Sequence, residues 1–208
     1  MKREDLRLYL VTDRSFLHGR SLIDVIMQAV AGGVTMVQLR EKDADTRSFI
    51  ELSIEIKQRL QPTNVPLIIN DRIDIALAIN ADGVHIGQSD MPYSIARRLL
   101  GCNKIIGLSV ENMNDVIEAN KLDVDYIGIS PVFSTATKKD TALPFGLSGL
   151  HEAVRTSVHP TVAIGGINIH TMQEVLDCGT DGIAVVSAIM GADNPEQSAR
   201  ELREIIRK

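Results

Sequence analysis

Short apolar segments alternate with amphipathic segments along the chain. Eight runs rich in Val, Ile and Leu lie at 6–11, 34–39, 65–70, 82–87, 103–109, 125–130, 160–165 and 181–187. Between these runs, apolar residues return every three or four positions, as they do on one face of a helix. The amphipathic segments cover 21–33, 47–61, 71–80, 92–101, 112–122, 148–157, 170–179 and 195–208. The pattern predicts eight strands, each followed by a helix.

The predicted strands are continuously apolar and do not alternate with polar residues. Such runs are typical of strands covered on both faces, which in a strict strand-helix alternation indicates a parallel sheet. Gly or Asn ends several of the helical segments, at Gly32-Gly33, Asn80, Gly101 and Gly179, and suits a left-handed C-terminal cap. Eight such units favour a (β/α)8 TIM barrel over a doubly wound open sheet, because no Gly-x-Gly-x-x-Gly fingerprint follows the first strand.

Composition narrows the class of protein. A chain of 208 residues that is 44% hydrophobic can form one domain, and we expect residues 1–208 to be a single catalytic barrel. The net charge of −5 and the interspersed basic residues argue against a nucleic-acid partner. The sequence has neither a signal-peptide core nor an apolar run long enough to span a membrane, which predicts a cytoplasmic protein without a membrane partner. Cys102 and Cys178 have no metal-ligand spacing, and we expect both to be reduced.

Polar residues gather where the predicted strands end, which is where TIM barrels carry their chemistry. In chain order they are Gln38, Arg40, Glu41, Lys42, Asn70, Asp71, Gln88, Asp90, Ser109, Gly165, Gly166 and Ser187. The loop that follows the sixth strand, 133–146, shows neither helical nor strand periodicity and contains Lys138 and Lys139. Cations and carboxylates at one rim would partly cancel unless a charged ligand lay between them.

A polyphosphate with a divalent metal ion fits this mixed rim. Carboxylates bind a hard cation, and Arg and Lys bind phosphate oxygens. Only two carboxylates, Asp71 and Asp90, are in evidence, which favours Mg²⁺ because it keeps waters and completes its shell with substrate phosphates. The glycine-bearing end of the seventh predicted strand and the end of the eighth suggest a second phosphate site built from backbone N–H groups.

Each of these features also has a plainer interpretation. Asp71 and Asp90 could cap the helices that follow them, since Asp is a favoured N-cap residue. Arg40 and Lys42 could be surface charges, and Gly165-Gly166 could be only a tight turn. His85 lies inside a predicted strand and is more often a satisfied core histidine, although it could also form part of a pocket wall.

Five separated motifs together resemble thiamine-phosphate synthases. They are QLREKD, INDRIDIALAINADGVHIGQSDMP, YIGISPVFSTATKKD, AIGGI and VVSAI, and they occur in that family's order from residue 38 to residue 189. The resemblance implies a (β/α)8 barrel that joins 4-amino-2-methyl-5-hydroxymethylpyrimidine diphosphate to 4-methyl-5-(2-hydroxyethyl)thiazole phosphate. The implied products are thiamine monophosphate and pyrophosphate, with Mg²⁺ as cofactor.

The resemblance also implies a role for individual residues. The metal ligands would be Asp71 and Asp90. The pyrimidine diphosphate would be held by Gln38, Leu39, Arg40, Glu41, Lys42, Asn70, Ser109 and Lys138, of which Arg40, Lys42 and Lys138 would act in catalysis. The thiazole phosphate would be held by Thr135, Ala136, Thr137, Gly166, Val186 and Ser187. Lys138→Ala is then expected to lower kcat on the order of a hundredfold or more.

Two other functions remain open at this point. The related thiazole tautomerases share sequence motifs such as INDRIDIAL, but they tend to carry a His after the sixth strand, where this chain has Ser130-Pro131. A non-catalytic phosphate-binding barrel would not need the paired carboxylates. An assay of the protein with both substrates and magnesium distinguishes the synthase, the tautomerase and the non-catalytic barrel, because only the synthase would form thiamine monophosphate and pyrophosphate. The sequence leaves the oligomeric state open.

Overall fold

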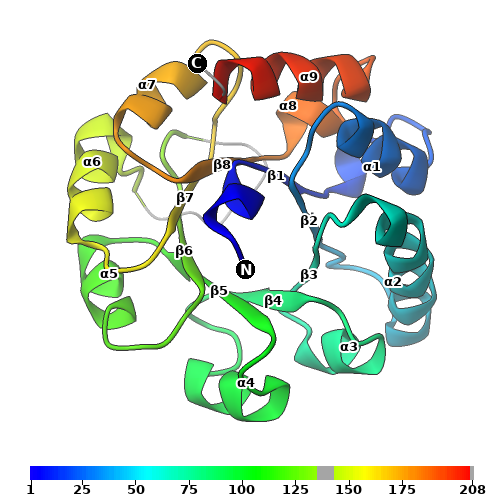
Figure 1. Cartoon of the computed structure of the whole chain (residues 1–208), viewed down its shortest axis with the longest axis horizontal. Coiled ribbons are helices and arrows are strands. Elements are labelled where there is room, and N and C mark those ends of the chain that lie inside the picture. Colours follow the sequence, from blue (N-terminus) through cyan, green and yellow to red (C-terminus); the bar gives the residue numbers. More distant parts are fainter. Residues whose placement is uncertain (135–142, 207–208) are drawn as a thin grey trace.

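The computed structural model describes residues 1–134 and 143–206, and they form a closed parallel barrel (Figure 1). Strands pair in chain order, and the last strand closes on the first. The strands are β1 (Leu8–Val11), β2 (Met36–Leu39), β3 (Leu67–Asn70), β4 (Gly83–Ile86), β5 (Ile105–Val110), β6 (Tyr126–Ile129), β7 (Thr161–Ile164) and β8 (Gly182–Val185). The predicted barrel fold is confirmed, and each apolar run overlaps one strand.

Helices surround the barrel, and every predicted helical segment overlaps one. They are α1 (Leu22–Ala31), α2 (Thr46–Leu60), α3 (Ile73–Ala78), α4 (Tyr93–Leu100), α5 (Met113–Ala119), α6 (Gly146–Thr156), α7 (Met172–Asp177), α8 (Ser187–Met190) and α9 (Pro195–Ile206). The sequence pattern did not reveal α8, because four residues are too few to show a helical period. Gly33, Asn80, Gly101 and Gly179 have positive φ at helix ends, as predicted, but Gly101 has ψ −177°, outside the left-handed helical region, and Gly32 has φ −75°.

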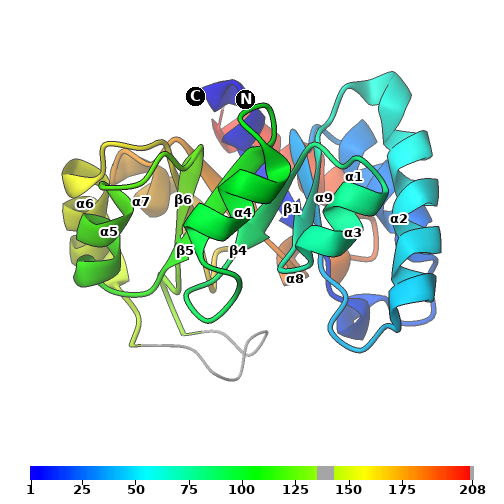
Figure 2. The same cartoon turned by 90° about the horizontal axis from the view of Figure 1, so that it is seen from below.

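Two apolar cores explain why the strands are apolar on both faces. The larger core lies between the strands and the helices and includes Leu10 and Leu39. The smaller core fills the barrel and includes Leu6, Tyr9 and Tyr126. Leu6 comes from the 3-10 helix η1 (Arg3–Leu6), which lies across one end of the barrel in Figure 1. This end of the barrel is therefore plugged, and Figure 2 shows the N-terminus and η1 on the upper side of the barrel.

A repeated contact closes the plugged end, where the strands begin. The residue just before each even-numbered strand accepts a hydrogen bond from a backbone N–H at the start of the preceding strand. The pairs are Thr35 Oγ1 with Leu8 N at 2.9 Å, Asp82 Oδ2 with Leu67 N at 2.8 Å, Asp125 Oδ2 with Ile106 N at 2.9 Å, and Asp181 Oδ2 with Thr161 N at 2.8 Å. In each pair the backbone N–H of the first residue donates in return to the carbonyl of the second.

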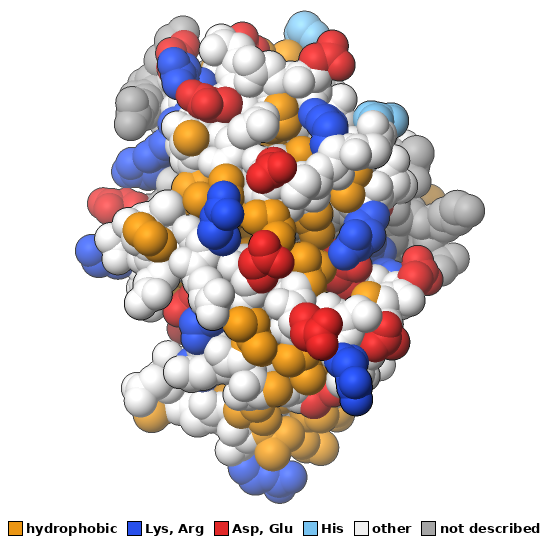
Figure 3. All heavy atoms as spheres, turned by 90° about the vertical axis from the view of Figure 1, so that its right-hand side faces the viewer, with side chains coloured by type: hydrophobic (Ala, Val, Ile, Leu, Met, Phe, Trp, Pro, Cys, Tyr) orange, Lys and Arg blue, Asp and Glu red, His pale blue; other side chains and the backbone are white. Residues whose placement is uncertain are grey.

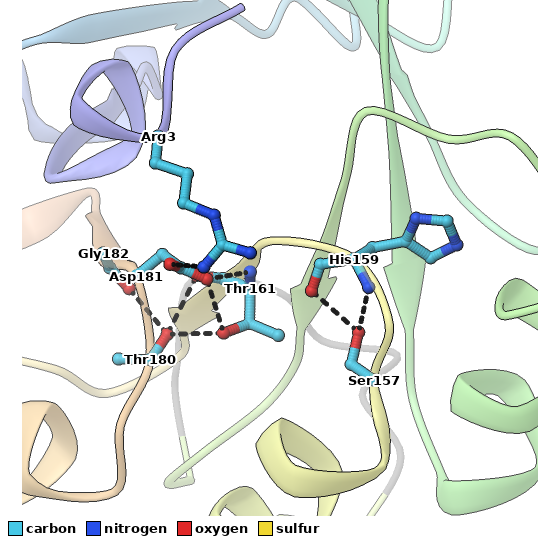
Figure 4. Close-up of polar contacts among 7 residues, drawn as sticks. All are labelled: Arg3, Ser157, His159, Thr161, Thr180, Asp181 and Gly182. Carbon is cyan, nitrogen blue, oxygen red and sulfur yellow. Dashed lines mark hydrogen bonds and ion pairs between the residues drawn. The ribbon is translucent and has the colours of Figure 1, made fainter.

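Figure 4 shows the last of these pairs with its neighbours. Arg3 Nη1 lies 2.7 Å from Asp181 Oδ1, so η1 is tied to the strand ends that it covers. The Thr180 hydroxyl donates to the Thr161 carbonyl at 3.0 Å. We call the four reciprocal pairs the N-terminal rim. Because they satisfy backbone N–H groups at the strand starts, their role is to hold adjacent strands in register.

The outer surface carries charges of both signs. Figure 3 looks onto the side formed by α1, α2 and α3, where basic and acidic side chains are interspersed around apolar ones. The apolar side chains exposed on α2 and α3 include Ile54 and Leu77. Within residues 1–134 and 143–206, no helix combines the length and apolar character that crossing a membrane requires. Both cysteines are free, and Cys102 is exposed.

Candidate active site

A cavity of about 330 Å³ opens where the strands end, opposite the N-terminal rim. We call this end the mouth of the barrel. Most of the predicted site residues that the structure describes line this cavity. They are Gln38, Arg40, Lys42, Asn70, Asp71, Asp90, Ser109, Gly166, Val186 and Ser187.

Asp71 lies at the mouth directly after β3. It has φ 60°, a conformation that Asp tolerates better than most residues, and its N–H donates to the His85 carbonyl at 2.9 Å. Its Oδ2 lies 2.7 Å from Lys42 Nζ. The N-cap position of α3 belongs to Arg72, without a side-chain cap. The N-cap interpretation of Asp71 is therefore wrong, and its carboxylate faces the cavity instead.

Asp90 lies beside Asp71 on the neighbouring loop. Its Oδ2 accepts a hydrogen bond from the Gly87 N–H at 2.7 Å, and the N-cap position of α4 belongs to Pro92. Burial raises the pKa of the Asp90 carboxyl, and the nearby Asp71 carboxylate raises it further. A bound cation would stabilise two neighbouring carboxylates in this arrangement.

Arg40 is the second cation of the cavity wall. Its N–H donates to Thr12 Oγ1 at 3.0 Å, and its Nη1 lies 3.3 Å from Asp13 Oδ2. Thr12 and Asp13 follow β1 and also line the cavity. These two residues were not predicted, although they are the first polar residues after the first apolar run. The Arg40 side chain is 23% exposed, so Arg40 is not an ordinary surface charge.

Leu39 and Glu41 do not appear among the described residues that line this cavity. The Leu39 side chain is fully buried in the core between the strands and the helices. Glu41 turns away and binds Arg14 Nε at 2.7 and 2.9 Å, beside a second, more open hollow of about 430 Å³. The predicted contacts of Leu39 and Glu41 with substrate stay predictions. Because the Leu39 side chain is buried in the core, only its backbone could make such a contact.

The ends of β7 and β8 form the opposite wall of the cavity. Gly165 and Gly166 have φ of 105° and 68°, a conformation that favours glycine. A Cβ on Gly166 would lie 2.8 Å from the Phe133 Cβ. The segment around Phe133, which follows β6, therefore passes close to this turn. Val186 and Ser187 follow on the adjacent strand end, at the start of α8. The remaining predicted residues of this site, Thr135, Ala136 and Thr137, lie outside the described residues, as does Lys138.

Three ring side chains form the cavity floor. They are Tyr9 on β1, His85 on β4 and Tyr126 on β6. Tyr9 and Tyr126 are almost fully buried, and their hydroxyl groups lie 2.8 Å apart. His85 binds both Tyr126 and Ser109, so its pocket-wall and satisfied-core interpretations both hold. The two tyrosines were not predicted, because a strand buried on both faces does not reveal which residues point inward.

The described residues contain too few ligands for a complete protein-only metal site. Within residues 1–134 and 143–206, no group of three His, Cys, Asp or Glu side chains is placed to hold a metal ion. Asp71 and Asp90 would therefore bind a metal ion only with help from waters or substrate oxygens. Mg²⁺ is the common cation that is bound in this way.

The fold and this cavity define a class of protein. A (β/α)8 barrel with charged side chains from several strand ends around one cavity is the architecture of a barrel enzyme that acts on anionic small molecules.

Comparison with known proteins identifies the family. The family model described as "Thiamine monophosphate synthase" matches residues 8–189. The thiamine-phosphate synthase of Clostridium novyi is 52% identical over 96% of this chain and 98% of its own length. That of Albidiferax ferrireducens is 52% identical over 99% and 94%. A solved thiamine phosphate pyrophosphorylase from Pyrococcus furiosus covers 99% of this chain and 97% of its own, with a TM-score of 0.90 and 39% identity. This chain belongs to the thiamine monophosphate synthase family, and it is a transferase.

Proposed function

We propose that this protein condenses 4-amino-2-methyl-5-hydroxymethylpyrimidine diphosphate with 4-methyl-5-(2-hydroxyethyl)thiazole phosphate, using Mg²⁺, in the cytoplasm. The products are thiamine monophosphate and pyrophosphate. One structural observation supports this proposal in addition to the family assignment. Lys42, Asp71 and Asp90 meet at the edge of a single cavity, where they offer both a cation site and a diphosphate site.

The two carboxylates fit Mg²⁺ by their chemistry. Burial and the proximity of Asp71 raise the pKa of Asp90, and a divalent cation between the two carboxylates would remove this conflict. With two protein ligands, the ion would keep sites for waters and for diphosphate oxygens. When bound, Mg²⁺ would supply charge stabilisation to the departing pyrophosphate.

Lys42 and Arg40 would exchange partners when the diphosphate binds. In the structure each is paired with a carboxylate, Lys42 with Asp71 and Arg40 with Asp13. The Lys42 side chain is 54% exposed, so its ion pair with Asp71 is weak and breaks at little cost. Lys42 is then available to a diphosphate oxygen, and Asp71 to the cation. Lys138, outside the described residues, is proposed as the third cation.

The organic parts of the two substrates would occupy opposite sides of the cavity. Gln38 and Asn70, at the ends of β2 and β3, would hold the pyrimidine. The thiazole phosphate would bind across the cavity, at Gly166, Val186 and Ser187. The ends of β7 and β8 are adjacent in the sheet, and exposed backbone at such a turn suits phosphate oxygens.

The proposed reaction is a substitution at the methylene carbon of the pyrimidine. The C–O bond to the diphosphate breaks and its electron pair leaves with pyrophosphate, while the aminopyrimidine stabilises the positive carbon. The thiazole nitrogen then forms the new C–N bond, and the positive charge remains on the thiazolium product. No proton has to be removed for this bond to form. The chain contributes cations for the leaving group and holds the two reactants in line.

A direct assay tests this function. Purified protein is mixed with both substrates and MgCl₂, and thiamine monophosphate and pyrophosphate are measured. The proposal predicts that both products appear in equal amounts and only when all three components are present. Conversion of a thiazole carboxylate tautomer, with no thiamine monophosphate, would replace it with the tautomerase function. Binding of the phosphates without turnover would replace it with a non-catalytic role.

A further inference from the structure

A line of five polar side chains crosses the floor of the cavity. Gln38 Nε2 lies 2.8 Å from the Tyr9 hydroxyl, and that hydroxyl lies 2.8 Å from the Tyr126 hydroxyl. The line continues from the Tyr126 hydroxyl to His85 Nδ1 at 3.0 Å, and from His85 Nε2 to Ser109 Oγ at 2.8 Å. All five residues line the cavity, so both ends of the line face the substrate.

Packing holds the two central rings in place. A Cβ on Gly107 would lie 2.1 Å from the Tyr126 Cζ, and a Cβ on Gly128 would lie 3.1 Å from the His85 Cε1. The Tyr126 ring therefore occupies space that a glycine on the adjacent strand β5 leaves open, and the His85 ring of β4 occupies space left open by a glycine on β6, two strands away. Tyr9 meets Tyr126 edge to face, with ring centroids 6.0 Å apart. Packing therefore helps to place these rings, in addition to their hydrogen bonds.

The number of protons available along the line decides which atom donates in each of its hydrogen bonds. Burial raises the pKa of both tyrosines above 10.0, so each phenol keeps one proton and donates one hydrogen bond. Each hydroxyl makes two bonds in the line, and it accepts one and donates the other. With Gln38 Nε2 donating to Tyr9, Tyr9 then donates to Tyr126, and Tyr126 donates to Nδ1 of His85. The imidazole then carries its proton on Nε2 and donates to Ser109.

The two ends of the line consequently present opposite chemistry to the cavity. Gln38 keeps its Oε1 as a hydrogen-bond acceptor, and Ser109 keeps its hydroxyl proton as a donor. If the Gln38 amide turned over, Tyr9 would donate to Oε1, and every proton along the line would have to reverse. Ser109 would then present an acceptor. The two ends are therefore coupled, although they lie on different strands.

We propose that Tyr9, Tyr126 and His85 are positioning residues that fix the donor and acceptor pattern of the substrate pocket. The choice of ligand rests on the proposed function: an aminopyrimidine carries an amino donor close to ring nitrogens that accept. This pattern complements an acceptor at Gln38 and a donor at Ser109. A pyrimidine whose amino group is replaced by a carbonyl presents the opposite pattern on that side. Such an analogue would be rejected because accepting it reverses the whole line.

The first test concerns the free protein. Tyr126→Phe keeps the ring and removes the central link. Histidine ¹⁵N NMR of the wild type should show His85 with its proton on Nε2 and a bare Nδ1, assigned by comparison with His85→Gln. In Tyr126→Phe the tautomers should mix. Tyr93→Phe is the matched control, since its hydroxyl donates to the Asp123 carbonyl outside the barrel, and it should leave the His85 signals unchanged.

The second test concerns the choice of substrate. With the aminopyrimidine diphosphate and its 4-oxo analogue, the ratio of kcat/KM values should fall at least about tenfold in Tyr126→Phe and stay unchanged in Tyr93→Phe. If Tyr126→Phe does not fold, Tyr9→Phe breaks the same line one link earlier.

The proposal is overturned if wild-type His85 carries its proton on Nδ1, or if removing either phenol leaves its tautomer unchanged. An unchanged ratio of kcat/KM values in Tyr126→Phe would also overturn it. The NMR test needs no substrate. If the wild type makes no thiamine monophosphate, the proposed function fails, and the tautomer result still decides whether the line has the stated direction.

Discussion

The two ends of the barrel use the same side chain, aspartate, in opposite ways. At the N-terminal rim, Asp82, Asp125 and Asp181 each accept a hydrogen bond from a backbone N–H of the preceding strand. At the mouth, Asp71 is paired with a half-exposed lysine, and Asp90 accepts a single N–H of its own loop beside another carboxylate.

This difference assigns the carboxylates of the N-terminal rim to stability and those of the mouth to catalysis. A carboxylate bound to the backbone of a neighbouring strand cannot exchange its partner without loosening the barrel. A carboxylate paired with a lysine at a cavity can release it to a ligand at little cost. We therefore expect substitutions at the two ends to affect different properties of the protein, and the following predictions test this separation in order of decreasing effect.

The largest effect is expected at the mouth. Asp71→Asn and Asp90→Asn should each lower kcat on the order of 100- to 1000-fold, because charge stabilisation of the leaving group depends on both carboxylates. The melting temperature should not fall. For Asp90 it should rise slightly at neutral pH, since burial disfavours the charged carboxylate. Steady-state kinetics and thermal unfolding measure the two properties, and an Asn variant with normal turnover would remove that residue from the site.

The next effect is expected at the N-terminal rim and concerns stability. Asp181→Ala should lower the free energy of unfolding by about 1–3 kcal/mol, because the Thr161 N–H and Arg3 lose their partner. Activity of the folded protein should persist. Asp177→Ala is the control, since this exposed residue on α7 contacts only Gln173 among the described hydrogen-bond partners of its side chain. Urea unfolding compares the variants. Equal losses in both would show that the rim carboxylate is an ordinary surface charge.

A smaller effect is expected for the residue that would move between partners. Lys42→Gln should lower kcat/KM about tenfold, because a diphosphate contact is lost while Asp71 and Asp90 remain. Stability should change by less than about 1 kcal/mol, since the ion pair with Asp71 is solvent-exposed. Kinetics at several magnesium concentrations measure the effect. A large loss of stability with unchanged kinetics would assign Lys42 to the fold.

The smallest effect concerns Tyr9, which lies between the two ends. Burial raises the pKa of Tyr9 above its ordinary 10.0. When the pH rises past about 10, the unfolded chain loses this proton first, so stability is fully present below that pH and decreases above it. The decrease from this residue is at most about 1.4 kcal/mol per pH unit. Tyr9→Phe should flatten the dependence measured by urea unfolding. Parallel curves for wild type and Tyr9→Phe would contradict the burial of a neutral phenol.

The sequence was sufficient to predict the barrel, because its alternation of apolar runs and amphipathic segments is regular along the whole chain. It was also sufficient to place Lys42, Asp71 and Asp90 at one rim, since the carboxyl ends of parallel strands meet at the same end. It did not decide whether Asp71 caps α3, because both roles place an Asp after a strand. The φ of 60° and the contact with Lys42 decide that question.

The floor of the cavity and the N-terminal rim could not be predicted. A strand that is buried on both faces gives no sign of which residues point inward, so Tyr9 and Tyr126 looked like their aliphatic neighbours. The rim depends on pairing between strands, which sets Asp181 opposite Thr161 across twenty residues of sequence. The recurring polar residue before each even-numbered strand was a signal, but its meaning appears only once the strand register is known.

A crystal structure of the protein grown with MgCl₂ and pyrophosphate tests the central claim most directly. The account predicts a metal ion between Asp71 and Asp90, with Lys42 moved from Asp71 to a pyrophosphate oxygen and the N-terminal rim unchanged. Pyrophosphate bound away from this cavity, with the Lys42–Asp71 ion pair intact, would contradict it.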